Sequence, residues 1–413
     1  MSTMMEEMNE RALKAGVPLS VQLDVTYRCN ERCIHCYLDH HDQGEMTAGE
    51  IMGVLDQLAE AGVFFLCFSG GEVLMRMDFF RILEYARSRL FCVKVKTDAT
   101  MIREKEADRL CALGVQSVQV SIYSHRPEVH DAITRLHGSL KRSLAGIRLL
   151  RERGIQTTIA NVLMRQNLQD YPGVVALAKE LGAVYTIDPT ITPAMDGDRS
   201  IIRLGINEME LRQVFRSPEL IGNVDEFCAP PPAVDDDIRD GLPCSASHTF
   251  CYISPYGDVY PCVQFPLPTG NVRQQKFMEI WKHSPQMNEV RSIHGRDLPT
   301  CSSCSHLGTC TRCPGLAYLE GNMRGPSTQD CEKSFARTGI PSANMVAKAA
   351  AKQGYPGGSR LVQITGWQQP FAPALMSLKL GPPSVINFMT AKQRGAPHGP
   401  GEGAAEVSPR PPE

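Results

Sequence analysis

The segment that decides the fold is residues 21–37, which reads VQLDVTYRCNERCIHCY. Its first six residues are mostly apolar or β-branched, which is typical of a strand buried in a parallel sheet. Three cysteines follow at once in the spacing CxxxCxxC, at Cys29, Cys33 and Cys36. One loop therefore offers three thiolates directly after the first strand.

Further strand-like runs follow at residues 64–70, 91–99, 117–124, 156–164 and 183–189. Their spacing is typical of βα units rather than hairpins. The capping-box pattern Thr47-Ala-Gly-Glu50 predicts a helix that ends near Ala61, before Gly62. Six such units predict an α/β fold, a partial (β/α)6 TIM-like barrel. The alternative is an open doubly wound sheet, but that fold ordinarily carries a glycine-rich phosphate loop where this chain has cysteines.

Composition divides the chain into four parts. We expect a barrel at 18–215, a linker at 216–243, a cysteine-rich domain at 244–335 and a mostly disordered tail at 336–413. The linker contains three consecutive prolines and an acidic run, which do not favour regular structure. The end of the tail is rich in glycine and proline, which is typical of disorder.

The overall charge and the cysteine count exclude several classes of protein. A net charge of −2 over 413 residues gives no electrostatic case for a nucleic-acid or membrane partner. The N-terminus does not read as a signal peptide, and the longest apolar run, 63–68, is too short to span a bilayer. An odd count of 15 cysteines argues against a secreted disulfide framework. We therefore expect a cytoplasmic protein whose clustered cysteines hold metal, with Cys67, Cys92 and Cys111 as buried structural thiols and Cys228 unassigned.

The first cysteine cluster suits a four-iron centre that keeps one iron open, because no fourth cysteine is nearby. A structural zinc site would need four ligands. The loop resembles the signature of the radical S-adenosylmethionine (SAM) superfamily. His35 occupies the aromatic position that lies near the adenine in that family. The resemblance extends to the element that binds the methionyl amino group, Ser69-Gly70-Gly71-Glu72.

Two further positions, Ser121 and Arg135, are similar to family positions that hold the ribose and the carboxylate of SAM. The resemblance implies a [4Fe-4S] cluster with SAM bound at its open iron. It also implies reductive cleavage of SAM to a 5′-deoxyadenosyl radical that abstracts hydrogen from a substrate. Simpler alternatives remain for single residues: Glu72 as a helix-capping carboxylate, His35 as a loop histidine, and the cysteines as a zinc site.

The C-terminal cysteines resemble the SPASM domain, which carries auxiliary four-iron clusters. The resemblance implies one auxiliary cluster on Cys244, Cys251, Cys262 and Cys313, and a second on Cys301, Cys304, Cys310 and Cys331. Two residues separate Cys310 from Cys313, where the family usually has three. A pair of zinc knuckles is the alternative, although zinc ribbons usually separate their CxxC pairs by about 12–20 residues. Truncation after Phe335 is expected to leave all the clusters intact, because it removes no cysteine.

The family implies an oxidoreductase that matures a ribosomally made precursor peptide, similar to the quinone-cofactor and mycofactocin peptide enzymes. Expected partners are a peptide or protein substrate and an electron donor such as flavodoxin or ferredoxin. Only about 20 residues precede the first strand, too few for an independent core, so if a leader is recognised we expect either a separate leader-peptide-binding protein or the tail to bind it. Modification of a tetrapyrrole side chain in the haem pathway is one alternative. Anaerobic sulfatase maturation is another, but those enzymes place an aspartate where this chain has Val263. A non-catalytic metal-binding protein is the third. The sequence names no catalytic base.

Overall fold

The computed structural model describes residues 2–38, 40, 44–195 and 198–353 of the chain. The strands are β1 Ser20–Thr26, β2 Phe65–Gly70, β3 Cys92–Thr97, β4 Ser117–Ser121, β5 Gln156–Val162, β6 Val184–Asp188, β7 Phe250–Ile253, β8 Asp258–Tyr260 and β9 Gly270–Asn271. The α-helices of the first half are α1 Ser2–Ala15, α2 Ala48–Glu60, α3 Phe79–Ser88, α4 Glu104–Ala112, α5 Pro127–Thr134, α6 Ser139–Glu152, α7 Tyr171–Glu180 and α8 Glu208–Phe215. Those of the second half are α9 Pro218–Ile221, α10 Val224–Phe227, α11 Asp236–Asp240, α12 Phe277–His283, α13 Pro285–Arg291, α14 Pro314–Leu319, α15 Thr328–Thr338 and α16 Ala343–Gln353.

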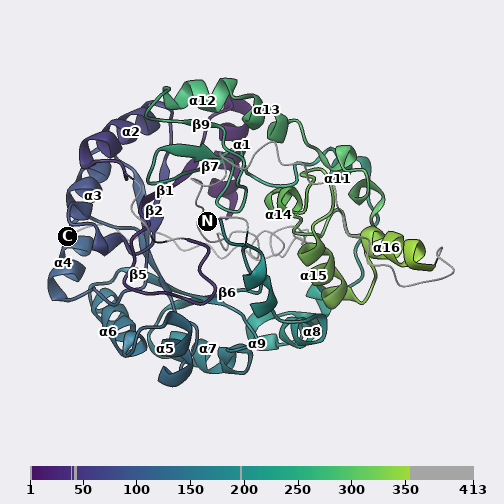
Figure 1. Ribbon diagram of the computed structural model, residues 1–413, viewed down its shortest axis with the longest axis horizontal. Helices are drawn as coiled ribbons and strands as arrows, with labels where there is room; N and C mark the ends of the chain where they lie inside the picture. The colour runs from purple at the N-terminus through teal and green to yellow at the C-terminus, as the bar shows by residue number, and fades with distance from the viewer. Residues whose placement is uncertain (1, 39, 41–43, 196–197, 354–413) are drawn as a thin grey trace, which may run out of the picture.

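All six predicted barrel strands are confirmed, and they pair in parallel in the order β6-β5-β4-β3-β2-β1. Figure 1 shows helices α2 to α7 around the outside of this curved sheet. The predicted helix after Thr47 is α2, and the Thr47 and Glu50 side chains form the expected reciprocal cap. The barrel is partial, as predicted, because β6 is an edge strand.

The cysteine-rich region adds three strands to the same sheet, which the sequence did not predict. Strand β7 pairs in parallel with β1, with Ser20 opposite Phe250 and Leu23 opposite Ile253. Strands β8 and β9 then continue antiparallel beyond β7. Every residue of β7 is buried. The part of the chain around Cys251 is therefore built into the barrel wall.

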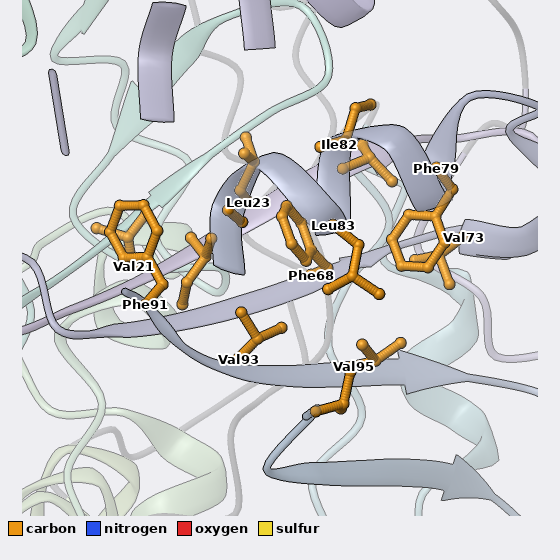
Figure 2. Close-up of a cluster of buried hydrophobic side chains, with 14 of the residues drawn as sticks. Val21, Leu23, Phe68, Val73, Phe79, Ile82, Leu83, Phe91, Val93 and Val95 are labelled. Atoms are coloured by element: carbon orange, nitrogen blue, oxygen red, sulfur yellow. The ribbon is translucent and has the colours of Figure 1, made fainter. Parts of the chain in front are cut away.

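The core that holds β1 to β3 in place is packed by α3. Figure 2 shows Phe79, Ile82 and Leu83 of α3 above the strands, near Phe68 of β2 and Val95 of β3. Each of these side chains is at most 1 % exposed. Burying a side chain of this size contributes about 1.5–3 kcal/mol. The apolar layer between α3 and the sheet thus fixes the strand ends that carry the site.

The predicted linker and tail differ from the structure. Three short helices, α9 to α11, lie within 216–243, so the expectation of irregular structure there is wrong in part. Helices α15 and α16 extend into the predicted tail, up to Gln353. The remainder of the expected disordered tail, 354–413, lies outside the described residues. No helix in the described part of the chain is long and apolar enough to cross a membrane.

Candidate functional site

A cavity opens at the carboxyl ends of the barrel strands, beside the first cysteine loop. Its wall on that side contains the three thiols of the loop, together with Ser69, Gly70 and Gly71 from the end of β2. The other wall comes from β3 to β6 and the segment after β6. It combines the apolar Ala160, Val162 and Ile191 with many polar residues: Lys96, Thr97, Asp98, Gln119, Ser121, Tyr123, Asn161, Thr186, Asp188, Thr190 and Thr192. The cavity therefore joins the thiol loop to a surface rich in hydrogen-bonding groups.

The end of α5 holds the cysteine loop in place. The backbone N–H groups of Arg32 and Ile34 donate to the carbonyl oxygens of Thr134 and Ile133, each at 2.9 Å. These carbonyls are among the last of the helix and have no partner inside it. The loop thereby gains a fixed conformation, and the backbone N–H of Glu31 donates to Sγ of Cys29 at 3.4 Å.

The three thiols lie close enough to influence one another. Burial raises the pKa of Cys33 well above its usual value, and the nearby Cys36 and Cys29 raise it further. Burial also raises the pKa of Cys36 to about 11. Buried thiols at such pKa values are protonated at neutral pH unless a cation stabilises the thiolate. The donor set suits a metal cluster that supplies this positive charge.

Two glycines at the end of β2 allow the chain to pass next to the cysteine loop. A Cβ atom at Gly70, which has a φ of 139°, would lie 2.0 Å from the carbonyl oxygen of Thr26. A Cβ atom at Gly71 would lie 2.3 Å from the carbonyl oxygen of Arg28. Neither position accepts a side chain. The two glycines bring the β2 end against the start of the cysteine loop and expose backbone to the cavity.

The carboxylate of Glu72 does not reach the cavity. It is fully buried, and it accepts hydrogen bonds from Thr97 Oγ1 at 2.7 Å, from the Asp98 backbone at 2.8 Å and from the Leu74 backbone at 2.9 Å. Burial raises its pKa well above the usual range, and Asp98 raises it further. Glu72 thus ties the end of β2 to the end of β3, and the expected direct contact with a ligand finds no support in this geometry.

Asp98 is the carboxylate that faces the cavity instead. Its Oδ1 accepts from the backbone and the hydroxyl of Thr100, both at 2.7 Å. Its Oδ2 is buried and has no hydrogen-bond partner. Burial raises the pKa of Asp98. A buried, unpaired carboxylate oxygen is costly, and a cationic ligand group in the cavity would satisfy it.

His35 and Ser121 line the cavity, and Arg135 does not. The His35 ring packs edge-on against Tyr123, with 4.8 Å between ring centroids, and its buried Nδ1 has no partner. Burial lowers the pKa of His35 to about 4, so the ring is neutral. Arg135 follows α5 in a left-handed conformation with φ of 55°, and its side chain is exposed. The structure therefore gives no support to the expected SAM contact at Arg135.

Asp188, at the end of β6, is a cavity residue that sequence reasoning missed. Its Oδ1 accepts from the Thr190 backbone at 2.8 Å, and burial raises its pKa while Lys333 lowers it. Lys333 donates to Thr190 Oγ1 at 3.1 Å and pairs with Asp330 at 2.6 Å. The signal that could have found Asp188 is its place at the carboxyl end of a barrel strand, where catalytic groups gather.

A second connection runs from the cavity wall to the cysteine-rich domain. The Gln264 Nε2 atom donates to Thr192 Oγ1 at 3.0 Å, and the Cys313 thiol lies 3.8 Å from Gln264 Oε1. The Cys313 backbone N–H donates to Asp330 at 2.8 Å. Val263, by contrast, is buried among tyrosines and is not part of the cavity lining.

The structure brings together the thiols expected for the first auxiliary cluster. Burial raises the pKa of Cys244 to about 12, and Cys262 raises it further. Burial is also the main cause of the raised pKa of Cys251 and of Cys313. The neighbouring Cys262 raises both pKa values further, and Cys244 adds to that of Cys313. Two of the sulfurs accept backbone N–H bonds at 3.4 Å, from Ala246 to Cys244 and from Leu316 to Cys313. N–H groups directed at sulfur are typical of iron–sulfur ligands.

The thiols of the second expected set also lie near one another. Burial raises the pKa of Cys301, and the neighbouring Cys331 and Cys304 raise it further. Burial raises the pKa of Cys310 to about 12, and Cys331 contributes to this shift. The first residues of α16 contact this set: the Ala343 backbone donates to Cys304 Sγ at 3.5 Å, and Asn344 Nδ2 donates to Cys331 Sγ at 3.8 Å. Residues beyond Phe335 therefore contact two of these thiols, so the expectation that truncation there leaves the clusters intact stays a prediction to be tested.

The zinc alternative gains no support from the placement of the side chains. Within the described residues, no three His, Cys, Asp or Glu side chains are placed to hold one ion. A tetrahedral zinc ion would need sulfurs within about 4 Å of each other. A four-iron cluster separates its ligands further, because each binds a different iron. Of the remaining thiols, Cys67 and Cys92 are half-buried, but Cys111 is exposed, so its predicted burial is wrong.

Comparison with known proteins bears on these sites. The family model of the radical SAM superfamily matches residues 23–178, and that of the SPASM iron–sulfur cluster-binding domain matches 244–305. The PqqA peptide cyclase of Xanthomonas campestris pv. campestris is 30 % identical over 347 residues, 78 % of this chain and 89 % of that protein. The mycofactocin maturase MftC of Mycobacterium tuberculosis is 29 % identical over 78 % of this chain and 85 % of its own. The AdoMet-dependent heme synthase of Methanosarcina barkeri is 28 % identical over 73 % of this chain and 93 % of its own.

A solved structure shares the fold. The crystal structure of Streptococcus suis SuiB bound to precursor peptide SuiA superimposes with a TM-score of 0.62 and 17 % identity, covering 79 % of each chain. The first family model covers the barrel part that carries the first cysteine loop, and the second covers the later cysteines from Cys244 to Cys304. The chain belongs to the radical SAM superfamily, and it carries an iron–sulfur-binding SPASM domain after the barrel.

Proposed function

We propose that this enzyme modifies a peptide, maturing a ribosomally made precursor. The observation that carries the proposal is the cavity, where a loop of three thiols faces a wall of hydroxyl, amide and charged groups from β3 to β6. Backbone amides and polar side chains of a peptide find hydrogen-bond partners on such a wall. Two relatives, the PqqA peptide cyclase and the mycofactocin maturase, are named for peptide chemistry.

We propose Cys29, Cys33 and Cys36 as the ligands of the initiating cluster. When bound at these thiols, a reduced four-iron cluster would supply the electron for cleavage of SAM, and so the radical that abstracts hydrogen from substrate. The residues of the chain bind and orient: Asp98 accepts the methionyl ammonium on its free Oδ2, and the backbone of Gly70 and Gly71 lies beside it. The barrel keeps water from the radical.

We propose Asp188 as the base that accepts the proton when the substrate radical is oxidised. The carboxylate lines the cavity, and burial raises its pKa, which favours proton uptake. Through Thr190 and Lys333 it is linked to Asp330, which holds the backbone of Cys313. Cys313 belongs to the first proposed auxiliary set, so the proton acceptor and the electron acceptor would lie on the same side of the substrate.

Tetrapyrrole modification is the second candidate, because the heme synthase relative is covered over 93 % of its length. The sulfatase-maturase hypothesis is disfavoured because Val263 stands at the position of the expected aspartate. Val263 is also buried away from the cavity.

Mass spectrometry tests the proposed function. The product of a short open reading frame beside this gene is incubated with the reconstituted enzyme, SAM and reductant, and in parallel with coproporphyrin-type tetrapyrroles. The proposal expects a mass change on the peptide alone. Conversion of the tetrapyrrole with the peptide unchanged would transfer the assignment to the second candidate.

A further inference from the structure

A group of exposed cations lies on the outer surface next to the first cysteine loop. It consists of Arg32 in the loop, Arg135 after α5, and Lys141 and Arg142 in the first turn of α6. We call these four residues the basic surface. Helices α5 and α6 contact each other on the outside of the barrel (Figure 1).

Contacts place the basic surface against the loop itself. The Arg32 guanidinium donates to the carbonyl oxygens of Cys29, at 2.5 Å, and Glu31, at 2.7 Å. Because the Arg32 backbone is bonded to the Thr134 carbonyl, the next residue of the chain, Arg135, lies beside the loop. The start of α6 lies beside the loop as well. Ser143 Oγ, next to Arg142, donates to the Asp98 carbonyl oxygen at 2.6 Å, and Thr100 Oγ1 both donates to Asp98 Oδ1 at 2.7 Å and accepts from Asn30 Nδ2 of the loop at 2.8 Å.

The acidic groups nearby do not cancel this charge. Glu31 is buried, at 4 % exposure. Asp131 is turned toward the start of α6, where it accepts from the Gly138 and Leu140 backbones and from Ser139 Oγ. Glu128 is exposed but lies 3.6 Å from Arg126, outside the basic surface. A chain with a net charge of −2 thus presents local positive charge where the loop reaches the surface.

The position of this charge indicates what it contacts. The inner side of the loop faces the cavity, which SAM and substrate fill, so a protein reductant has to approach from the outer side. Arg32 in the middle of the loop is exposed, so the outer side of the loop is close to the surface. Opposite charges on two proteins raise the rate of productive encounter between them.

We propose that the basic surface is the docking site of a small acidic one-electron carrier protein. The inference rests on the proposed cluster at Cys29, Cys33 and Cys36. In the step, the reduced flavin or iron–sulfur centre of the carrier is oxidised by one electron, and the initiating cluster is reduced from its 2+ to its 1+ state. No bond forms or breaks, and no proton needs to move.

The test compares two double variants of equal charge. K141E/R142E changes the basic surface, while K105E/R148E changes two exposed cations elsewhere on α4 and α6. Each lowers the net charge from −2 to −6, because each Lys or Arg to Glu change removes two units. Both full-length proteins are reconstituted, and their iron content is checked. Reduction of the cluster is followed by stopped-flow absorbance and electron paramagnetic resonance, with reduced flavodoxin as the probe.

We expect K141E/R142E to be reduced by flavodoxin about tenfold more slowly than the parent at low salt, with the difference shrinking at high salt. K105E/R148E should stay within about twofold of the parent. Photoreduced deazaflavin, which is small and needs no docking, should reduce all three proteins equally. Equal flavodoxin rates for the two double variants would overturn the docking proposal. Failure of deazaflavin to produce a reduced cluster in the parent would instead overturn the proposed cluster.

Discussion

The phenol oxygens of Tyr27 and Tyr252 lie 2.6 Å apart, so a residue two places before Cys29 is bonded to the residue after Cys251. Tyr252 also donates to Asp24 Oδ2 at 3.0 Å, which leaves Tyr27 as the donor in the pair. Both rings are fully buried in a cluster against which Cys36 and Cys262 pack. The two cysteine regions are therefore joined by one aromatic core.

Replacing Tyr252 by Phe tests this junction. The change removes two buried hydrogen bonds, from the Tyr27 hydroxyl and to Asp24 Oδ2, while Gln22 still donates to Asp24 Oδ1. It should lower the free energy of unfolding by about 1–3 kcal/mol. Tyr260 is the matched control, because its ring stacks on Tyr252 and its buried hydroxyl has no partner. Anaerobic urea unfolding should show little change for Tyr260→Phe. An equal decrease in the free energy of unfolding in Tyr252→Phe and Tyr260→Phe would show that the hydrogen bonds of Tyr252 do not stabilise the junction between the two regions.

SAM binding should depend on Asp98 more than on Glu72. Asp98→Asn removes the charge of the free carboxylate and should weaken SAM binding about ten- to a hundredfold, the effect of losing one charged hydrogen bond. Glu72→Gln disturbs the link between β2 and β3 and should lower thermal stability instead. Calorimetric titration with SAM and thermal unfolding measure the two effects. Weaker binding in Glu72→Gln together with unchanged binding in Asp98→Asn would reverse the assignment.

The sequence predicted the barrel strands well because parallel strands buried on both faces leave a strong apolar signal. It missed β7, because four residues within a cysteine-rich segment carry too little pattern to reveal pairing with β1, which lies more than 220 residues earlier. The cysteine loop was found from its spacing and its place after the first strand, and Gly70-Gly71 from the resemblance to the radical SAM superfamily. Asp98 and Asp188 were not, since a single carboxylate at a strand end becomes notable only when its burial and its missing partner are known.

Asp188→Asn should separate SAM cleavage from product formation. The asparagine cannot take a proton, and loss of a general base costs about a hundred- to ten-thousandfold in rate. 5′-Deoxyadenosine should still form, while modified peptide falls relative to it. Asp237→Asn, at an exposed aspartate outside the cavity, is the control. Chromatography with mass detection gives the ratio of the two products, and a parental ratio in Asp188→Asn would remove Asp188 from the proposed chemistry.

Two truncations test the role of residues 342–344. A chain ending at Gln353 keeps the Ala343 and Asn344 contacts to Cys304 and Cys331 and should retain about 12 iron atoms, as expected for three four-iron clusters. A chain ending at Phe335 loses these contacts and also part of α15, and should lose about four iron atoms. Anaerobic iron and sulfide analysis decides the outcome. Full iron content in the shorter chain would show that α16 adds nothing to the second auxiliary set.

The central claim is that Cys29, Cys33 and Cys36 hold the cluster that cleaves SAM. The most direct measurement is 5′-deoxyadenosine formation, together with iron content, in the variant with all three cysteines changed to alanine. The account predicts a loss of about four of 12 iron atoms and no 5′-deoxyadenosine with any reductant, while the SPASM clusters remain. A triple variant that still cleaves SAM at the parental rate would contradict the account.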